Sequence, residues 1–277
     1  MKDFVTKIVK SSKNITPLAG ISYVNSEFNK CGLSQLIDNE LGVRASTVGY
    51  QYSDIFRNWT NLFLCGGECA EDIQVHLRPA LEQIPGNKPP SADTLLRANK
   101  ELSVNNTEIV SSSGKTYNIN INDNMNSLNI SSLLLTGQLQ KGKIYDLDFD
   151  NQIISHDKYD AGTTYKKNTG YFPGIASIGA NIVYVENRAG NANVKLGQAN
   201  TLKRIDKLLK DREISIYRTR MDAGSYSQEI VDAASKISEL FYIRANKCHS
   251  LTERINQIND WQTVELSEAI SPKVNQL

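Results

Sequence analysis

The chain has 277 residues, of which 40% are hydrophobic and 22% are charged, and its formal net charge at pH 7 is +1. This composition is typical of a globular protein, excludes a disordered or fibrous chain, and leaves room for two modest domains. Four cysteines are too few for a disulfide framework in a chain of this size. No stretch reaches the roughly 20 apolar residues that span a bilayer, so we expect a cytoplasmic protein with no membrane partner.

Residues 1–102 are expected to form an all-α domain. Apolar residues recur at helical spacing from residue 18 to residue 41, with an interruption at Gly32. A second apolar helical run covers residues 53–64 and is ended by Gly66 and Gly67. A third helix is predicted to begin at Ser91, because two prolines precede this residue and serine is a favoured N-cap.

Residues 103–140 have a different character. They are rich in asparagine and serine and lack a sustained apolar face, which predicts a polar linker or surface excursion. Only a short strand at 117–121 and a short helix at 127–139 are expected within this segment.

From residue 141 to residue 277 the pattern predicts an α/β domain. Strands are predicted at 144–150, 175–178, 182–185, 214–221 and 240–244, and helices at 202–209, 227–240 and 250–258. Residues 179–181 are expected to form the turn of a hairpin between the second and third strands. The order of three strands, helix, strand, helix and strand is typical of a layered α/β domain.

The strand predicted at 144–150 carries a row of acidic residues. Side chains alternate between the two faces of a strand, so Asp146, Asp148 and Asp150 share one face at intervals of roughly 6.5 to 7 Å. Three like charges in a row repel one another and need a cation, a basic neighbour or open solvent. The alternative is a solvated edge strand in which Asp150 only begins a turn.

A further acidic residue closes the strand predicted at 214–221. Asp222 ends this strand, Gly224 permits a sharp turn, and Ser225 with Gln228 has the spacing of a capping box. Ligands of α/β sheets bind at the carboxyl ends of strands, where Asp222 is expected to lie. The alternative is that Asp222 is a plain turn or cap residue.

Two aspartates at strand ends, taken together, suggest a magnesium site. Mg²⁺ binds one or two protein carboxylates and keeps waters or substrate phosphates as its other ligands. A two-metal site of this kind activates the attacking oxygen and stabilises the leaving oxygen in a displacement at phosphorus.

Several motifs occur in the order found in insertion-sequence transposases of the DDE class. Residues 147–152 (LDFDNQ) resemble the first-aspartate strand of this family, and residues 220–226 (RMDAGSY) resemble its second-aspartate motif, with Ser225 at the position of the usual aromatic residue. Other segments similar to the family are 170–174 (GYFPG), 187–191 (NRAGN), 65–72 (CGGECAED) and 90–97 (PSADTLLR). The resemblance spans nearly the whole chain.

This resemblance implies a ribonuclease H-like mixed sheet flanked by helices and preceded by an all-α domain. It implies that Asp150 and Asp222 are catalytic ligands of Mg²⁺, for which Mn²⁺ can substitute. Asp148 replaces Asp150 if the strand register differs by two residues. Arg220 shares the face of Asp222 by alternation and is expected to hold a phosphate or a carboxylate.

The family has a third catalytic acid, a glutamate on a later helix, and no matching motif occurs before residue 277. Glu253 lies on a predicted helix but follows Asp222 too closely. We therefore expect an incomplete catalytic domain of a transposase, inactive by itself. The alternatives are a catalytically inactive product that binds DNA or dimerises, and a different metal-dependent phosphohydrolase.

The resemblance also implies double-stranded DNA at transposon ends as a partner, a homodimer, and association with the nucleoid. Basic residues that could neutralise DNA phosphates are Lys166, Lys167, Lys203, Arg204, Lys207 and Arg220. The alternative is that these charges only solvate the surface. By analogy with the family, the helices that end near Arg97 are expected to form a helix-turn-helix for the terminal repeats.

Overall fold

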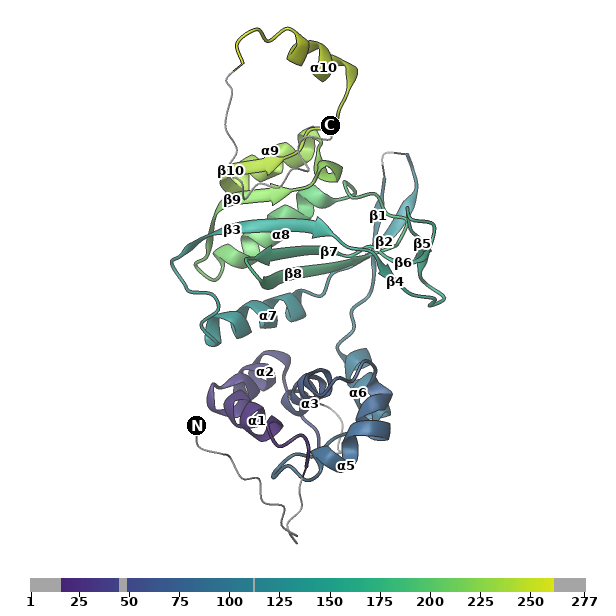
Figure 1. Cartoon of the computed structure of the whole chain (residues 1–277), viewed down its shortest axis with the longest axis vertical. Helices are drawn as coiled ribbons and strands as arrows, with labels where there is room; N and C mark the ends of the chain where they lie inside the picture. The colour runs from purple at the N-terminus through teal and green to yellow at the C-terminus, as the bar shows by residue number, and fades with distance from the viewer. Residues whose placement is uncertain (1–15, 45–48, 112, 262–277) are drawn as a thin grey trace, which may run out of the picture.

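The computed structural model describes residues 16–44, 49–111 and 113–261. The chain forms a helical N-terminal region and a mixed α/β region whose sheet is flanked by helices (Figure 1). The expected α/β class is confirmed at this level. Residues 1–15 and 262–277, which the expected domains include, lie outside the described residues. No helix in the described part of the chain is both long and apolar enough to cross a membrane.

The helical region begins with two helices separated by Gly32. This residue has a left-handed backbone with φ +88°, which glycine adopts without a steric penalty. Ser91 caps the last helix as predicted, because its hydroxyl accepts a hydrogen bond from the Thr94 backbone at 3.2 Å. The helices are α1 (Ile21–Lys30), α2 (Leu33–Leu41), α3 (Tyr52–Leu64), α4 (Ala70–Asp72), the π-helical turn η1 (Ile73–Leu77), α5 (Arg78–Leu81) and α6 (Ala92–Glu101).

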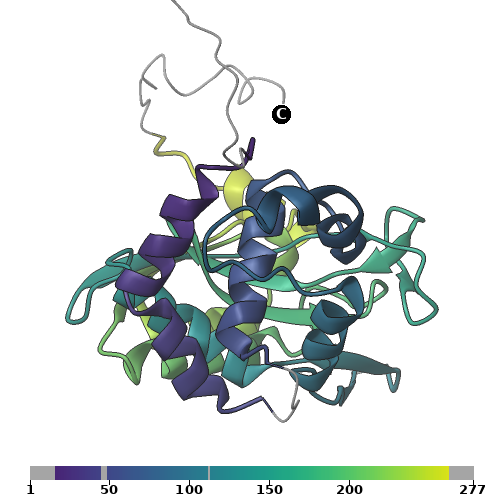
Figure 2. The same ribbon diagram turned by 90° about the horizontal axis from the view of Figure 1, so that it is seen from below.

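The helical region has its own core and also packs against a helix of the following segment. Leu62, Leu81 and Leu95 are fully buried at the centre of this region. Ile37 of α2 packs with Leu128 of α7, the helix formed by Asp123–Leu135. Helix α7 therefore lies between the helical region and the sheet (Figure 1), and the view from below shows the helical region in front of the sheet (Figure 2).

The α/β region is built on a seven-stranded sheet with the order β1-β2-β8-β7-β3-β9-β10. Neighbouring strands are antiparallel from β1 to β3, whereas β3 pairs with β9, and β9 with β10, in parallel. The strands are β1 (Thr107–Val110), β2 (Thr116–Asn120), β3 (Ile144–Asn151), β7 (Gly174–Ile178), β8 (Asn181–Arg188), β9 (Ser215–Met221) and β10 (Ser238–Ile243).

Two helices cover one face of the sheet. They are α8 (Gln198–Lys210) and α9 (Gln228–Ile237), and their apolar sides form the main core together with the side chains of the sheet (Figure 1). Leu202 and Ala234, one from each helix, are completely buried. We call the opposite face of the strands β3 and β9 the open face.

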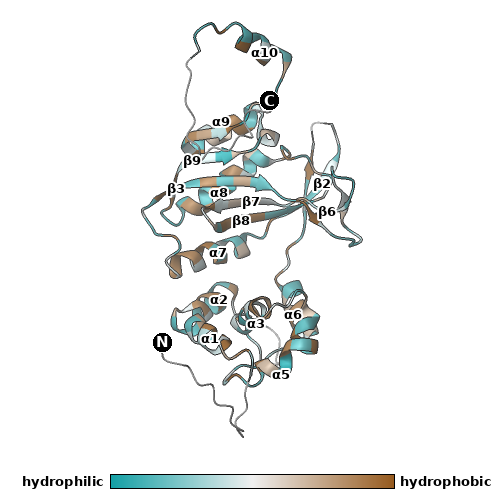
Figure 3. Ribbon diagram, viewed as in Figure 1, coloured by the Kyte–Doolittle hydropathy of each residue, from teal (hydrophilic) through white to brown (hydrophobic). Residues whose placement is uncertain are grey.

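Strand β3 follows the predicted alternation. Leu147 and Phe149 point into the core and are 0% and 2% exposed. Asp146, Asp148 and Asp150 alternate with them and lie on the open face, where they are half-buried or exposed. The change from hydrophobic to hydrophilic residues along β3 is visible in Figure 3. The acidic row therefore lies on the face that α8 and α9 leave uncovered.

Residues 103–140 contribute more structure than the expected linker. Strands β1 and β2 form a hairpin, and β2 extends the sheet by pairing Ile119 with Arg188 and Asn120 with Asn187. Ile119 is only 1% exposed. One buried apolar side chain and the backbone hydrogen bonds to β8 are enough to hold this polar segment in the sheet.

A small three-stranded sheet follows β3, and the sequence does not predict it. Its order is β4 (Ile154–Ser155), β6 (Thr169–Tyr171) and β5 (Gly162–Thr163). A Cβ atom at Gly190 would lie 2.3 Å from the carbonyl oxygen of Gly170 and 2.5 Å from that of Gly162, so the backbone segments meet at glycines. The strands are short and lack an apolar alternation, which explains why the pattern does not indicate them.

The turn after β9 differs from the prediction. Ser227 is the N-cap of α9, and Ser225 belongs to a short 3-10 turn, η2 (Ala223–Ser225), where it is 1% exposed. The predicted capping box of Ser225 with Gln228 is therefore wrong. The hydroxyl of Ser225 instead accepts a hydrogen bond from Gln198 at 2.8 Å, because α8 approaches the turn.

Candidate active site

The two aspartates singled out in the sequence follow neighbouring parallel strands. Strands β3 and β9 pair in register up to Phe149 and Met221. The next residues are Asp150 and Asp222, and the backbone of Asp222 is still extended, with φ −74° and ψ 177°. Asp150 and Asp222 thus each follow the last paired residue of their strand. We call this position the third rung, and the facing pairs Asp146–Arg218 and Asp148–Arg220 the first and second rungs.

The two lower rungs are ion pairs. On the first rung, Arg218 Nη2 lies 2.8 Å from Asp146 Oδ2. On the second rung, Arg220 donates to both oxygens of Asp148, from Nε at 2.5 Å and from Nη2 at 2.6 Å. These hydrogen bonds and the charge of each aspartate raise the pKa of both guanidinium groups. Arg220 thus holds a carboxylate, which is one of the two roles expected for it.

The third rung has two acidic residues and no base. Asp150 and Asp222 are both exposed, and neither forms an ion pair within the described residues. The Asn151 backbone donates to Asp150 Oδ1 at 2.8 Å. Like charges that face each other on neighbouring strands destabilise the pair, so this rung requires a cation or solvent between its carboxylates.

The turn that follows β9 is fitted around the Asp222 carboxylate. A Cβ atom at Gly224 would lie 3.1 and 3.3 Å from the two oxygens of Asp222, so glycine allows the turn to pass close to them. Ser225 Oγ lies 3.4 Å from Asp222 Oδ1, and it is held from α8 by the fully buried Gln198. The sequence analysis did not single out Gln198. The feature that could have indicated it is a polar residue at the start of an otherwise amphipathic helix.

The donor set of the third rung suits a hard cation with an open coordination sphere. Magnesium prefers oxygen ligands and binds through one or two carboxylates while waters and substrate phosphates fill its other positions. Across residues 16–44, 49–111 and 113–261, no three side chains of His, Cys, Asp or Glu gather as a metal site. Glu253 of α10 (His249–Asn256) has its Oε2 3.4 Å from His249 Nδ1 on the same helix. Two carboxylates are thus the protein ligands that the third rung could offer to a cation.

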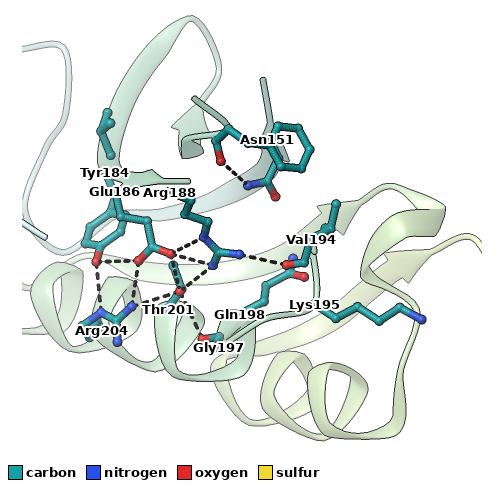
Figure 4. A network of polar contacts seen from close by, with 12 residues as sticks. Asn151, Tyr184, Glu186, Arg188, Val194, Lys195, Gly197, Gln198, Thr201 and Arg204 are labelled. Carbon is teal, nitrogen blue, oxygen red and sulfur yellow. Dashed lines mark hydrogen bonds and ion pairs between the residues drawn. The ribbon is translucent and has the colours of Figure 1, made fainter. Parts of the chain in front are cut away.

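A buried network links β8 to α8 behind the sheet (Figure 4). Arg188 Nη2 lies 2.6 Å from Glu186 Oε1, and both side chains are completely buried. Arg204 Nη2 lies 2.7 Å from Glu186 Oε2, and Thr201 donates to Glu186 Oε1 at 2.8 Å. The guanidinium of Arg188 also donates to the Val194 carbonyl at 2.9 Å. Arg188 lies in the segment 187–191 that resembles the family motif, and its buried contacts give it a structural role.

Two side chains of this network, Glu186 and Tyr184, have shifted pKa values. Burial would raise the pKa of the Glu186 carboxyl, but the charges and hydrogen bonds of Arg188 and Arg204 outweigh burial and lower it. Burial, assisted by the charge of Glu186, raises the pKa of the Tyr184 phenol to about 12. At neutral pH the network therefore contains an ionised Glu186 and a neutral Tyr184.

The basic residues expected to contact DNA fall into separate groups. Lys203 and Lys207 are exposed and one turn apart on α8. Lys166 and Lys167 are exposed in the turn between β5 and β6. Arg204 is committed to Glu186 and Tyr184, which leaves less of its guanidinium for a phosphate. The six residues proposed from the sequence therefore come from three elements, which are α8, the β5–β6 turn and β9.

A hollow on the described surface lies away from the aspartate pair. It has a volume of about 750 Å³ and lies beside the first rung, where Ile144, Tyr217, Asp146 and Arg220 line it. Comparison with known protein families gives no match, and no curated protein is found to be similar to this chain. Functional inference therefore depends on the residues and their geometry.

Proposed function

We propose that the chain is the catalytic and DNA-binding part of a DDE-type DNA transposase. The reaction is Mg²⁺-dependent cleavage and strand transfer at the ends of a mobile DNA element. The observation that carries this proposal is the third rung, where two carboxylates without a basic partner follow adjacent parallel strands of a mixed sheet. The order β8-β7-β3-β9-β10, with helices against one face, supports a ribonuclease H-like core.

In this proposal Asp150 and Asp222 hold the divalent cation, which is Mg²⁺ or its substitute Mn²⁺. When bound between them, the metal would activate an attacking oxygen and stabilise the leaving oxygen of a phosphodiester. Gly224 leaves space beside the Asp222 carboxylate, and Ser225, held by Gln198, orients it. The partners are double-stranded DNA at transposon ends and a second copy of the chain.

A second candidate function is a catalytically inactive protein that binds DNA ends or dimerises. The observation that favours it is that no third acidic side chain joins Asp150 and Asp222 within the described residues. In this case the exposed lysines of α8 and of the β5–β6 turn neutralise phosphates, and the aspartate rung does not support turnover.

DNA cleavage by the purified chain tests the two candidates against each other. The substrate is a duplex that carries the DNA bordering the coding region, with Mg²⁺ or Mn²⁺ and with EDTA as the metal-free reference. If the chain is an active enzyme, strand cleavage requires metal and falls by at least about a hundredfold in Asp150→Asn and in Asp222→Asn, because each removes a ligand. Asp157→Asn, a change of another exposed aspartate, is the matched control.

Three outcomes decide between the candidate functions. Binding of the duplex without metal-dependent cleavage rejects the enzyme and leaves the inactive DNA-binding protein. Cleavage that survives both substitutions rejects the third rung as the site. Turnover of a small phosphodiester with no preference for DNA supports a different metal-dependent phosphohydrolase.

A further inference from the structure

The three rungs differ in whether a basic side chain balances the charge of their aspartate. On the first and second rungs each aspartate of β3 faces an arginine of β9, and on the third rung Asp150 and Asp222 directly follow the last paired residues of the two strands. The two lower rungs are therefore neutral, and the open face between β3 and β9 concentrates its negative charge at one end.

The second rung is the one that matters for a cation on the third. By strand spacing, Asp148 lies roughly 6.5 to 7 Å from Asp150 on the same face, whereas Asp146 lies twice as far away. Electrostatic interactions of exposed charges are screened over about 8 to 10 Å at physiological ionic strength. A free Asp148 would therefore act on a cation at Asp150, but a free Asp146 would be largely screened.

Arg220 occupies both oxygens of Asp148. Its Nε donates to one oxygen and its Nη2 to the other, in the fork geometry that arginine forms with a carboxylate. The pair is accessible to solvent, with Arg220 54% and Asp148 36% exposed. Exposed ion pairs contribute little to folding, so stability alone does not explain this arrangement.

The first rung is anchored differently. Arg218 Cζ lies 5.9 Å from the centroid of the Tyr217 ring and 5.8 Å from that of Tyr242, and its buried Nε has no hydrogen-bond partner within the described residues. Such contacts with aromatic faces fix a guanidinium in place. Arg218 therefore has packing partners of its own, whereas no aromatic ring stacks on Arg220 within the described residues.

We propose that Arg220 is a positioning residue for the cation site: it neutralises Asp148 and occupies both of its oxygens, so that a divalent cation binds only at Asp150 and Asp222. This inference rests on the proposed function, because it assumes a cation on the third rung. It explains why three aspartates in a row on β3 provide a site that uses only the last of them.

A double-mutant cycle of Arg220 and Asp148, the two residues of the second rung, tests the inference. Binding of Mn²⁺ alone to the full chain is measured by the electron paramagnetic resonance signal of the free ion, without DNA. Arg220→Gln should bind Mn²⁺ about tenfold more tightly, because a divalent ion gains an uncompensated unit charge at roughly 7 Å. Asp148→Asn should weaken binding by a similar factor, because it leaves the Arg220 charge uncompensated. The double variant should return to the affinity of the wild type.

Arg218→Gln is the matched control. It makes the same chemical change one rung further from the site, and we expect Mn²⁺ affinity within about twofold of the wild type because of screening. Circular dichroism verifies that each variant is folded. If one variant of the cycle does not fold, the other single variant still tests the opposite change in affinity.

The results separate the inference from the function on which it rests. If Asp150→Asn and Asp222→Asn leave wild-type Mn²⁺ affinity unchanged, the cation site fails and the inference fails with it. If those variants lose Mn²⁺ but Arg220→Gln binds no more tightly than the wild type, only the positioning role is overturned. The positioning role is also overturned if Asp148→Asn does not reverse the effect of Arg220→Gln.

Discussion

Glu186 and Arg188 lie two residues apart on β8 and form an ion pair at 2.6 Å in which both side chains are completely inaccessible to solvent. They share a face because side chains alternate along a strand. A buried pair of this kind loses its hydration on both sides, so its geometry and its additional hydrogen bonds decide whether it stabilises the fold. Thr201, Arg204 and the Val194 carbonyl supply those hydrogen bonds.

Removal of the Glu186 charge should destabilise the protein strongly. We expect Glu186→Gln to lower the free energy of unfolding by about 3 to 5 kcal/mol, because it leaves the buried Arg188 without its counterion. Urea unfolding at pH 7 measures the change. Glu213→Gln is the matched control, since Glu213 pairs with Lys141 on the surface, and its effect should stay below about 1 kcal/mol. Equal effects of the two changes would contradict the role given to the network.

The same carboxyl should make stability depend on acid pH. The native pKa of Glu186 is lowered, whereas the unfolded value is about 4.3. The stabilisation is therefore fully present above about pH 4.3 and is lost as the pH falls through the lower native pKa. Melting temperatures of the wild type and Glu186→Gln, measured from neutral pH downwards, should converge below this pH. A difference that stays constant with pH would disprove the assignment.

Gly190, which packs against the backbone of the small three-stranded sheet, should not tolerate a side chain. Gly190→Ala would place its Cβ 2.3 and 2.5 Å from two backbone oxygens, so we expect a loss of about 1 to 3 kcal/mol in unfolding free energy. Gly20→Ala is the control, because no atom lies within 4 Å of its added Cβ and its φ of −57° suits alanine. Its effect should stay within about 0.5 kcal/mol.

The salt dependence of DNA binding should show which lysines contact phosphates. Each phosphate contact contributes about 0.9 to the slope of log affinity against log salt concentration. If α8 contacts DNA, replacement of Lys203 and Lys207 by Gln should lower the slope by about 2 without changing stability. The corresponding change of Lys166 and Lys167 tests the β5–β6 turn. If replacing a pair of lysines leaves the slope unchanged, that pair does not contact the DNA.

Much of the α/β region could be predicted because its signals are local. The hairpin of β7 and β8 agrees with the predicted strands, and its turn contains Gly179 with φ +60°. The predicted strand at 214–221 and helix at 202–209 are confirmed within a few residues by β9 and α8. Each of these elements has an apolar periodicity that matches its own secondary structure.

Elements that depend on distant partners could not be predicted. Strand β1 has a single partly buried residue, Ile109, and joins the sheet only through its hairpin partner β2. Ser225 has the right spacing for a cap, but the approach of Gln198 from α8 gives its hydroxyl a different role. A single sequence contains no signal for either contact, because both depend on how separate elements pack in the folded chain.

The candidate site could likewise be predicted only in part. Alternation along β3 and the position of Asp222 after a strand could be inferred locally, and in the structure both aspartates directly follow the last paired residues of neighbouring parallel strands. The pairing of Arg220 with Asp148 depends on the register between β3 and β9. That register is a property of the assembled sheet, so Asp148 stayed open as an alternative ligand at the level of sequence.

The parallel pairing of β3 with β9 also has a kinetic consequence. Asp148 and Arg220 are separated by 72 positions in the sequence, and a parallel pair cannot be closed by a tight turn. Contacts of such long range form slowly, because the entropy of closing a long loop opposes them. A divalent ion bound at Asp150 and Asp222 would need both strands in place, so it would stabilise only the folded chain.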